Sequence, residues 1–444
     1  MDLTYGPQYE IFRLKVRQFI ADNWRGAAAD DAATREFRQR AAKQGYMYRL
    51  IPKEYGGGGE EPDPLKNQVI REELALAKAP SELGGLGVQM LAPTLLERGA
   101  EWQKKTFIPK TLTGEYIWCQ GYSEPGSGSD LASLRTSAVL DGDSWVINGQ
   151  KVWTTGGHLA HFMFMLCRTE PKKPKHEGIS YLLVDMSQPG IEVRPLKQIT
   201  GSSEFNEVFF TNATTPSEWI VGERGRGWSV ANTTLSHERN MVGSVSASDH
   251  LFNSVVKLAK RRKINGRPAI ENDGIRDELV KLQGYLESQR YSGMHQFTKS
   301  LAKESAGVLP MLNKLAVTDF GKQIAELALE LLGATSLLAG SATQSMSPTM
   351  VGLTADPKSV SESEPRAIPG DERFMNQYLG SLGMAIAGGT SNIQRNIIAE
   401  RGLGLPKDAP STHSRSDSER TNPTTNQKTP SSEERQARES DSSN

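Results

Sequence analysis

The chain reads YSEPGSGSD at Tyr122–Asp130, and this stretch decides the fold because the sequence pattern changes on either side of it. Before it, apolar residues recur at helical spacing; after it, short apolar runs alternate with Gly and Pro, as in a small β domain. Glycines and serines in this position suit a loop whose backbone N–H groups approach an anionic or heteroaromatic ligand. Taken alone, the same loop fits an ordinary turn at least as well.

The loop is not a dinucleotide-binding signature of the Rossmann type. Leu131 stands where that signature requires its third glycine, and no strand precedes the glycines. A phosphate-binding GxxxxGK[ST] loop does not occur in the sequence. A cofactor at this loop must therefore be held in another way.

The residues after the loop have the pattern of a β domain. Trp145–Ile147, Asn148-Gly149 and Gln150–Trp153 together predict a hairpin with a tight primed turn at Asn-Gly. Further strands are expected at Phe162–Cys167, Tyr181–Val184 and Val208–Phe210.

Lys151–Gly157 (KVWTTGG) ends the expected hairpin and contains an indole beside two hydroxyls. Trp153 could stack on a flat cofactor while the hydroxyls bond its polar edge. A Trp that closes the core of the β domain is the alternative.

Helical periodicity dominates the rest of the chain, so we expect a mostly helical protein with a small central β domain. The expected parts are a helical domain at 1–120, a β domain at 121–225, a helical domain at 226–407 and a disordered tail at 408–444. The tail contains too few apolar residues to offset the entropy of ordering it. A Ser-, Thr- and Pro-rich insertion is expected at about 340–371.

Composition excludes several classes of protein. Lys plus Arg equals Asp plus Glu at 52 each, so no net charge favours nucleic acid or an anionic membrane. No apolar run is long enough for a membrane span, and Met1–Glu10 lacks the order of a secretory signal. Only Cys119 and Cys167 are present, which favours a cytoplasmic protein. His158 and His161 have no Cys nearby, so no metal site is expected.

A helix expected after Gly227 places a carboxylate within an apolar stripe. Spacings of three and four residues put the following on one face: Trp228, Ala231, Leu235, Glu238, Val242 and Val245. Arg239 points elsewhere and is no automatic partner of Glu238. Buried unpaired carboxylates usually have a raised pKa, which suits a general base. An ion pair with a basic residue of another helix is an equally open alternative.

Four motifs, in this order, resemble the acyl-CoA dehydrogenase family: IPKEYGG at Ile51–Gly57, SEPGSGSD at Ser123–Asp130, NGQKVWTT at Asn148–Thr155 and GTSNIQR at Gly389–Arg395. The resemblance covers nearly everything from Met1 to about Pro406. It implies a helical N-terminal domain, a β-barrel-like middle domain and a C-terminal helical bundle. It also implies FAD as cofactor and an acyl-CoA as substrate, in fatty acid or lipid metabolism.

The resemblance also implies roles for single residues. FAD contacts are expected at Gln120, Tyr122, Ser123, Ser129, Trp153, Thr155, Thr390 and Asn392, and at Arg262, whose counterpart reaches the cofactor of a neighbouring subunit. Substrate contacts are expected at Ser129, Arg239 and Gly388. Asn265 and Glu330 depart from the family pattern near the Arg262 contact.

The catalytic base is expected at Glu238. Many family members place the base just before a Gly-Thr-Ser sequence, where this chain has Gly388, which cannot abstract a proton. A minority, resembling isovaleryl-CoA and long-chain acyl-CoA dehydrogenases, carry the base on the helix after the β domain, and Glu238 matches that position. The implied reaction removes the α-proton to Glu238 and the β-hydrogen as hydride to the flavin, giving a trans-2-enoyl-CoA. The Gly388 N–H and a ribityl hydroxyl would hold the thioester oxygen.

The resemblance further implies an electron-transfer flavoprotein as acceptor and a homo- or hetero-oligomer, either dimer or tetramer. Two alternatives are an acyl-CoA oxidase and a flavoprotein subunit of a heteromeric dehydrogenase. The Gly388-Gly389-Thr390 sequence also resembles large subunits of pimeloyl-CoA-type and steroid side-chain dehydrogenases. The acyl group itself is not specified by the sequence.

Overall fold

The computed structural model describes residues 6–26, 31–242, 245–302, 304–337 and 373–407. The expected insertion at 340–371 and the expected tail at 408–444 lie outside the described residues. Met1–Leu403 forms one compact unit, and the elements below belong to it. Its architecture confirms the predicted class: helices precede and follow a single large sheet formed by the middle of the chain.

The N-terminal part consists of helices joined by short turns. They are α1 (Pro7–Asn23), α2 (Asp31–Lys43), α3 (Pro64–Leu76), α4 (Ala92–Arg98) and α5 (Glu101–Leu112), with short turns η1 (Lys53–Tyr55) and η2 (Gly87–Leu91). Val16 and Ile20 of α1 are buried, as the helical spacing predicts. In the IPKEYGG motif, a Cβ on Gly57 would lie 2.2 Å from the Ile51 carbonyl oxygen, so this close turn requires glycine.

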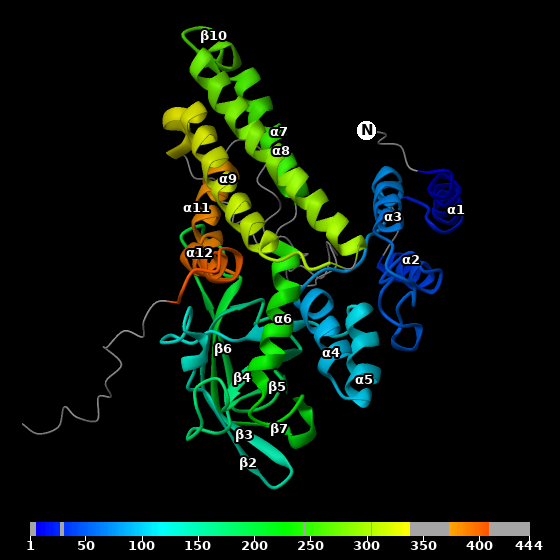
Figure 1. Cartoon of the computed structure of the whole chain (residues 1–444), viewed down its shortest axis with the longest axis vertical. Coiled ribbons are helices and arrows are strands. Elements are labelled where there is room, and N and C mark those ends of the chain that lie inside the picture. Colours follow the sequence, from blue (N-terminus) through cyan, green and yellow to red (C-terminus); the bar gives the residue numbers. More distant parts are fainter. Residues whose placement is uncertain (1–5, 27–30, 243–244, 303, 338–372, 408–444) are drawn as a thin grey trace, which may run out of the picture. The chain divides into compact units, whose positions relative to one another are not determined.

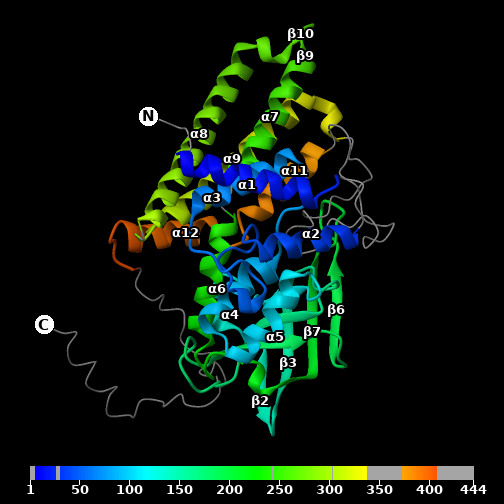
Figure 2. The ribbon, with the colours of Figure 1, turned by 90° about the vertical axis from the view of Figure 1, so that its right-hand side faces the viewer.

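The middle of the chain forms an eight-stranded sheet of order β6-β7-β3-β2-β4-β5-β8, with β1 paired in parallel to β4 (Figures 1 and 2). The strands are β1 (Trp118–Gly121), β2 (Ser137–Asp141), β3 (Ser144–Thr155), β4 (Phe162–Arg168), β5 (Ile179–Asp185), β6 (Ile191–Leu196), β7 (Phe205–Pro216) and β8 (Ile220–Val221). The three predicted apolar runs are confirmed as parts of β4, β5 and β7. The sheet begins at Trp118, so the expectation that no strand precedes the glycine loop is wrong. Strands β1, β2, β6 and β8 were not predicted.

The predicted hairpin turn at Asn148-Gly149 is wrong. Strand β3 runs through these two residues, and its pairing with β7 only shifts register between Ile147 and Gly149. The turn that does connect two adjacent strands follows Asp141, where Leu140 pairs with Trp145 across Gly142. Gly142 has φ +57°, so the Asp-Gly sequence there supplies the left-handed residue of the turn.

Strands β4 and β5 are apolar on both faces, which explains their continuous apolar sequences. Phe164 of β4 and Tyr181 of β5 face a core shared with the N-terminal helices and α6 (Gly227–Val242). Met163 and Leu182 face a second core within the sheet domain. One face of the sheet is therefore covered by the helix that carries Glu238.

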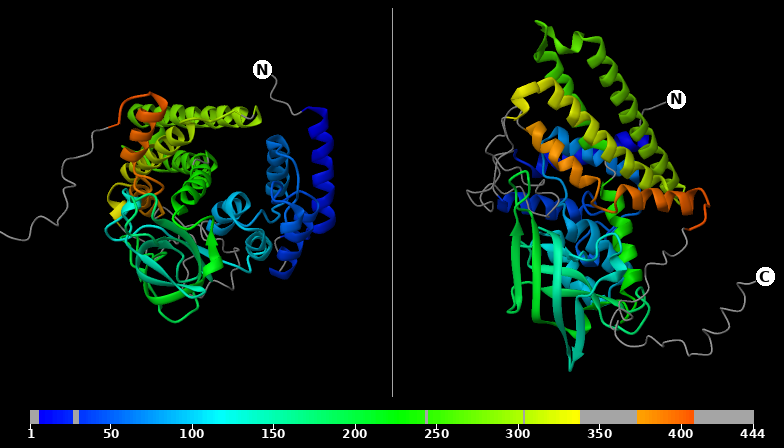
Figure 3. Two further views of the ribbon diagram at one scale, coloured as in Figure 1. Left: turned by 60° about the horizontal axis from the view of Figure 1, so that its bottom comes forward. Right: turned by 90° about the vertical axis from the view of Figure 1, so that its left-hand side faces the viewer.

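The C-terminal part is a helical bundle that continues from α6. It contains α7 (Val245–Arg261), α8 (Asp273–Leu301), α9 (Leu309–Leu332), α11 (Arg373–Met384) and α12 (Ser391–Ile397), with a hairpin of β9 (Lys263–Ile264) and β10 (Arg267–Pro268). Helices α7, α8 and α9 pack on one another, and α11 lies along α9 (Figure 3). Within the described ranges, no helix combines the length and the apolar character that a membrane crossing demands.

Candidate active site

The loop that follows β1 is held against the sheet by β3. Nζ of Lys151 donates to the Tyr122 carbonyl oxygen at 3.1 Å and to Oε1 of Glu124 at 2.8 Å. The Val152 N–H donates to the Ser123 carbonyl oxygen at 2.9 Å. Tyr122 and Ser123, both predicted site residues, therefore have a backbone that is anchored by the strand carrying Trp153.

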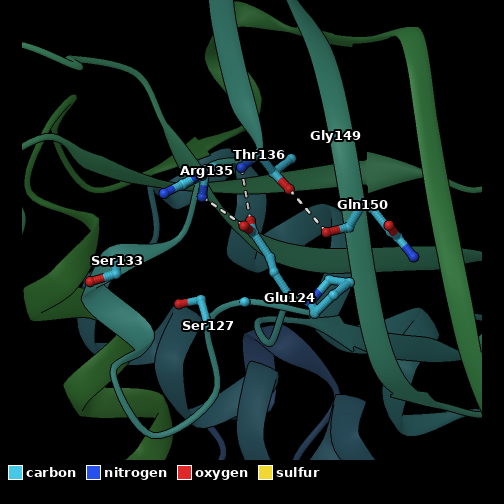
Figure 4. Close-up of a pocket in the computed structure, with 9 residues that line it drawn as sticks. Glu124, Ser127, Ser133, Arg135, Thr136, Gly149 and Gln150 are labelled. Carbon is cyan, nitrogen blue, oxygen red and sulfur yellow. Dashed lines mark hydrogen bonds between the residues drawn. The ribbon is translucent and has the colours of Figure 1, made fainter. Parts of the chain in front are cut away.

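Glu124 and Lys151 form a buried ion pair at the centre of this arrangement. The Glu124 carboxylate also accepts the N–H groups of Arg135 at 2.6 Å and Thr136 at 2.8 Å (Figure 4). Burial alone would raise the pKa of the Glu124 carboxyl, but the Lys151 charge and these hydrogen bonds outweigh it and lower that pKa. Sequence reasoning missed both residues as parts of the site.

A pocket of about 400 Å³ opens beside the same loop (Figure 4). Its lining residues are Glu124, Pro125, Gly126, Ser127, Ser133, Arg135, Thr136, Gly149 and Gln150. None of them is among the residues predicted to contact FAD or substrate. The predicted site thus lies on other parts of the loop and of β3.

Trp153 protrudes from the sheet. Its φ is +61°, which is unusual for a bulky residue, and the β3–β7 pairing shifts register between Lys151 and Thr154. The indole is 61% exposed and meets Phe205 edge to face, with ring centroids 6.1 Å apart. The alternative of a core Trp is therefore wrong, because the bulge turns the indole outward, where a flat ligand can stack on it.

Two side chains, one on β1 and one on β3, each carry a buried polar atom that lacks a hydrogen-bond partner in the described part of the chain. Neither Nε2 of Gln120 nor Oγ1 of Thr154 has a hydrogen-bond partner among the residues that the structure describes. Buried polar groups are nearly always satisfied, so unsatisfied atoms on the two strands next to the loop fit a bound ligand with a polar edge. Together with the exposed indole of Trp153, these atoms fit a flavin at this loop, and the individual contacts at Gln120, Tyr122, Ser123, Trp153 and Thr155 remain proposals.

Helix α6 is fixed by a chain of buried hydroxyls. Oγ1 of Thr234 lies 3.0 Å from Oγ1 of Thr94 and donates to the Tyr181 hydroxyl at 3.4 Å. The Tyr181 ring meets the Tyr122 ring edge to face, with centroids 6.3 Å apart. This face of α6 is thereby oriented toward the loop. The side chains of Glu238 and Arg239 lie outside the described part of the chain.

The turn between α11 and α12 contains Gly388. Gly388 and Gly389 have φ of +62° and +88°, a conformation that favours glycine. Nε2 of Gln394 donates to the Gly388 carbonyl oxygen at 2.8 Å. Thr390 is the N-cap of α12, and its Oγ1 accepts the Ile393 N–H at 3.2 Å.

The other predicted site residues lie at the surface. Ser129 is exposed next to Asp130, whose carboxylate pairs with Lys175 at 2.8 Å, and Asn392 is exposed on α12. Arg262 follows α7, and its Nη2 donates to Oγ1 of Thr335 at 3.4 Å. The β9–β10 hairpin beside Arg262 is at the end of α7 and α8 remote from the sheet (Figures 1 and 2). Arg262 is thus not brought to the flavin loop of its own chain.

The polar groups around the site are not arranged for a metal ion. In the described ranges, no group of three potential His, Cys, Asp or Glu ligands is close enough to hold one. Nδ1 of His158 lies 3.2 Å from Oδ1 of Asn206, and Nδ1 of His161 accepts the Ile117 N–H. Both histidines therefore have contacts within the protein.

Comparison with known proteins identifies the family. Models of the N-terminal, middle and C-terminal domains of acyl-CoA dehydrogenase match residues 6–115, 119–213 and 225–403. Acyl-CoA dehydrogenase IpdE1 of Mycobacterium tuberculosis is 37% identical over 415 residues, covering 90% of this chain and 98% of the relative. Long-chain specific acyl-CoA dehydrogenase of Sus scrofa is 30% identical over 295 residues, covering 64% of this chain and 67% of the relative.

The solved structures agree with this identification. The ChsE4-ChsE5 complex from Mycobacterium tuberculosis contains a chain with a TM-score of 0.68 and 27% identity, covering 92% of this chain and 100% of that one. The glutaryl-CoA complex of glutaryl-coenzyme A dehydrogenase has a TM-score of 0.65 at 21% identity, covering 92% and 98%, and shares the fold. The chain therefore belongs to the acyl-CoA dehydrogenase family, and it is an FAD-dependent oxidoreductase of lipid metabolism that acts on acyl-CoA.

Proposed function

We propose that this enzyme dehydrogenates a bulky acyl-CoA between its α and β carbons, with Glu238 as the base and the Gly388 N–H as a donor to the thioester oxygen. The product is the trans-2-enoyl-CoA. The observation that carries the proposal is the placement of position 238 on α6.

By helical spacing, position 238 shares a face of α6 with residues that are buried. At 100° per residue, it falls between Thr234 on one side and Ala231 and Leu235 on the other. Ala231 and Thr234 are fully buried, and Thr234 contacts Tyr181 beside the flavin loop. Thr234, which shares this face, is thereby linked through Tyr181 to Tyr122 of the flavin loop. By contrast, Thr233 and His237 contact Arg98 and Glu97 of α4 on the adjoining face.

Gly388 complements this base in two ways. Because it has no side chain, it supplies no competing acid and leaves room beside the α carbon. Its N–H remains available, and donors preset toward developing negative charge usually contribute the largest catalytic effect. The positive φ of Gly388 is a conformation that favours glycine at this position.

The residues proposed to hold FAD come from three segments. Gln120, Tyr122, Ser123 and Ser129 lie on β1 and the loop, Trp153 and Thr155 on β3, and Thr390 and Asn392 on α12 and its cap. FAD, when bound, supplies the two-electron acceptor for the β-hydrogen. Trp153 would cover the flavin and keep water from it. The Gln120 amide, whose Nε2 lacks a hydrogen-bond partner in the described part of the chain, would donate to the polar edge of the flavin ring.

We further propose that the active species is an oligomer. Arg262 lies away from the flavin loop of its own chain (Figure 1), which supports the FAD contact in a neighbouring subunit that the family resemblance implies. Two similar structures, the ChsE4-ChsE5 complex and the Tcur3481-Tcur3483 steroid ACAD, are named as pairs of different chains. From these pairs we propose a heteromer, and from the steroid enzyme a ring-sized acyl group. An electron-transfer flavoprotein is the acceptor that the family resemblance implies. The cytoplasm remains the proposed location.

The proposal is tested with Glu238→Gln, which keeps the size of the side chain but removes the proton acceptor. General-base catalysis contributes about 10²–10⁴-fold, so turnover with a chemical electron acceptor should fall by at least about 100-fold. FAD content and melting temperature should match the wild type. Glu223→Gln, at an exposed position before α6, is the matched control and should be fully active.

The same experiment separates the alternatives. If Glu238 instead formed a structural ion pair, the variant would lose stability while the folded fraction kept normal turnover.

A panel of CoA thioesters with straight, branched, dicarboxylic and steroid acyl groups identifies the substrate class. Faster turnover of straight short chains than of steroid chains would contradict the proposed bulky acyl group.

A further inference from the structure

Helix α9 contains a buried lysine that the reaction described above does not use. Lys314 is 1% exposed, and its Nζ donates to the Gly389 carbonyl oxygen at 3.0 Å. No ion pair links it to an Asp or Glu in the described part of the chain. Burying an ammonium group costs free energy, and one hydrogen bond to a carbonyl compensates for only part of that cost. The buried position of Lys314 therefore indicates a specific role.

The target of Lys314 is the turn that contains Gly388. Gln394, also 1% exposed, donates to the Gly388 carbonyl, so two buried side chains hold two successive carbonyls. A Cβ on Gly389 would lie 2.7 Å from Nε2 of Gln394, which shows how closely the amide approaches the turn. The glycines themselves are only half-buried, so the turn is fixed from behind while its other side stays accessible.

Both ends of this turn have a proposed function. The N–H of Gly388 precedes the Gly389 carbonyl and is the proposed donor to the thioester oxygen. Thr390 follows that carbonyl and is a proposed FAD contact. The carbonyl held by Lys314 therefore lies between the substrate donor and the cofactor contact, and movement there would disturb both.

We infer that Lys314 is a positioning residue of the active site, which fixes the Gly388-Gly389-Thr390 turn so that the oxyanion donor and the FAD contact keep their relative places. The inference rests on the proposed role of the Gly388 N–H. Gln394 acts on the same turn from α12, so loss of either donor should have the same two consequences. Lys314 reaches the turn from a different helix and thereby couples α9 to the site.

The test uses Lys314→Met, which keeps the length and apolar part of the side chain but removes the donor. Loss of a charged hydrogen bond corresponds to about a ten- to hundredfold change. The dissociation constant of FAD, measured by flavin fluorescence on reconstitution, should rise by about that factor. In the FAD-saturated enzyme, kcat should fall by about the same factor with KM little changed, because the oxyanion contact acts in the transition state.

Lys322→Met is the matched control, since Lys322 lies on the same helix with half of its side chain exposed. The inference is overturned if Lys314→Met has the FAD affinity and kcat of Lys322→Met, even with a lower melting temperature. If Lys314→Met does not fold, the FAD dissociation constant and kcat of Gln394→Leu are measured instead. Values equal to those of Lys322→Met would then overturn the inference. FAD affinity requires neither substrate nor Glu238, so an error in the proposed base would leave this readout intact.

Discussion

At the scale of single residues, the ion pair between Glu124 and Lys151 organises the cofactor loop. Lys151 is completely buried, and its ammonium bridges the Glu124 carboxylate and the Tyr122 carbonyl. Glu124 in turn ties the loop to the start of β2 through the Thr136 N–H. A buried ion pair of this kind adds little net stability while it is intact. Removing one charge is costly, because the other charge is then buried without a partner.

Lys151→Met should therefore be strongly destabilising, because it leaves the Glu124 carboxylate buried without its cation. We expect a loss of about 3–5 kcal/mol in the free energy of unfolding, measured by urea denaturation. Lys175→Met is the control: its pair with Asp130 is equally short, at 2.8 Å, but exposed, so at most about 1 kcal/mol should be lost. Equal losses in the two variants would contradict the assigned role of Lys151.

The effect of Lys151→Met should depend on pH. The pKa of Glu124 is lowered on folding from an ordinary value of 4.5, so its contribution to stability is complete above that value and is lost as the pH falls through the lowered pKa. Without Lys151, burial raises the pKa of Glu124, and protonation relieves the penalty. The difference between wild type and variant should shrink as the pH falls from the raised Glu124 pKa of the variant toward the lowered Glu124 pKa of the wild type.

Some residues of the site could be predicted from the sequence, whereas their contacts could not. Trp153 was recognisable from its motif, but its exposure depends on the bulge formed against β7, a contact between distant segments. Glu124 was visible inside the loop motif, yet its partner is a strand residue that faces inward only in the folded sheet. Gln394 and Lys314 act through a turn whose shape no local pattern specifies.

At the scale of elements, strand β3 explains the one clear error in the predicted topology. Asn-Gly is a local hairpin signal, but Asn148 meets Asn212 of β7 across the sheet: its Oδ1 accepts the Asn212 N–H at 2.9 Å, and its Nδ2 donates to Oδ1 of Asn212 at 3.0 Å. This pairing lets β3 continue as a bulged strand. The turn instead forms at the earlier Asp141-Gly142. Both dipeptides are local turn signals, and contacts between distant strands determine which of them forms the turn.

Gly149→Ala tests this bulge. Gly149 has φ +146°, and a Cβ there would lie 2.6 Å from Oγ1 and 2.7 Å from Cα of Thr136. Strain and overpacking together should cost about 2–4 kcal/mol of unfolding free energy, measured by chemical denaturation. Gly126→Ala, with open space around the new Cβ, should change stability by less than about 0.5 kcal/mol. A neutral Gly149→Ala would mean that Gly149 is not packed as described.

At the scale of the whole molecule, the order of helical, β and helical parts was readable from periodicity, whereas the assembly was not. Val280, Tyr291 and Met294 are each more than half exposed on the face of α8 opposite its buried residues. Together with the position of Arg262, they make α8 the proposed contact with a neighbouring subunit. The domain limits at 120, 225 and 407 also remain proposals.

Tyr291→Asp should disrupt that contact and release FAD, because the Arg262 of the neighbour would be lost with it. Light scattering should show a smaller species, and absorbance should show less flavin per chain. Tyr285→Asp is the control, since Tyr285 is exposed on a different face of α8 and should leave the assembly intact. A wild-type monomer with full flavin content and full activity would rule out the proposed oligomer.

The most direct test of the proposed chemistry is the rate at which an acyl-CoA bleaches the flavin absorbance of Glu238→Gln without oxygen. This single turnover requires removal of the α-proton and the β-hydrogen but no electron acceptor. With the thioester that the wild type turns over fastest, bleaching should be at least about 100-fold slower in the variant, at equal FAD content. Bleaching at the wild-type rate would show that Glu238 is not the base.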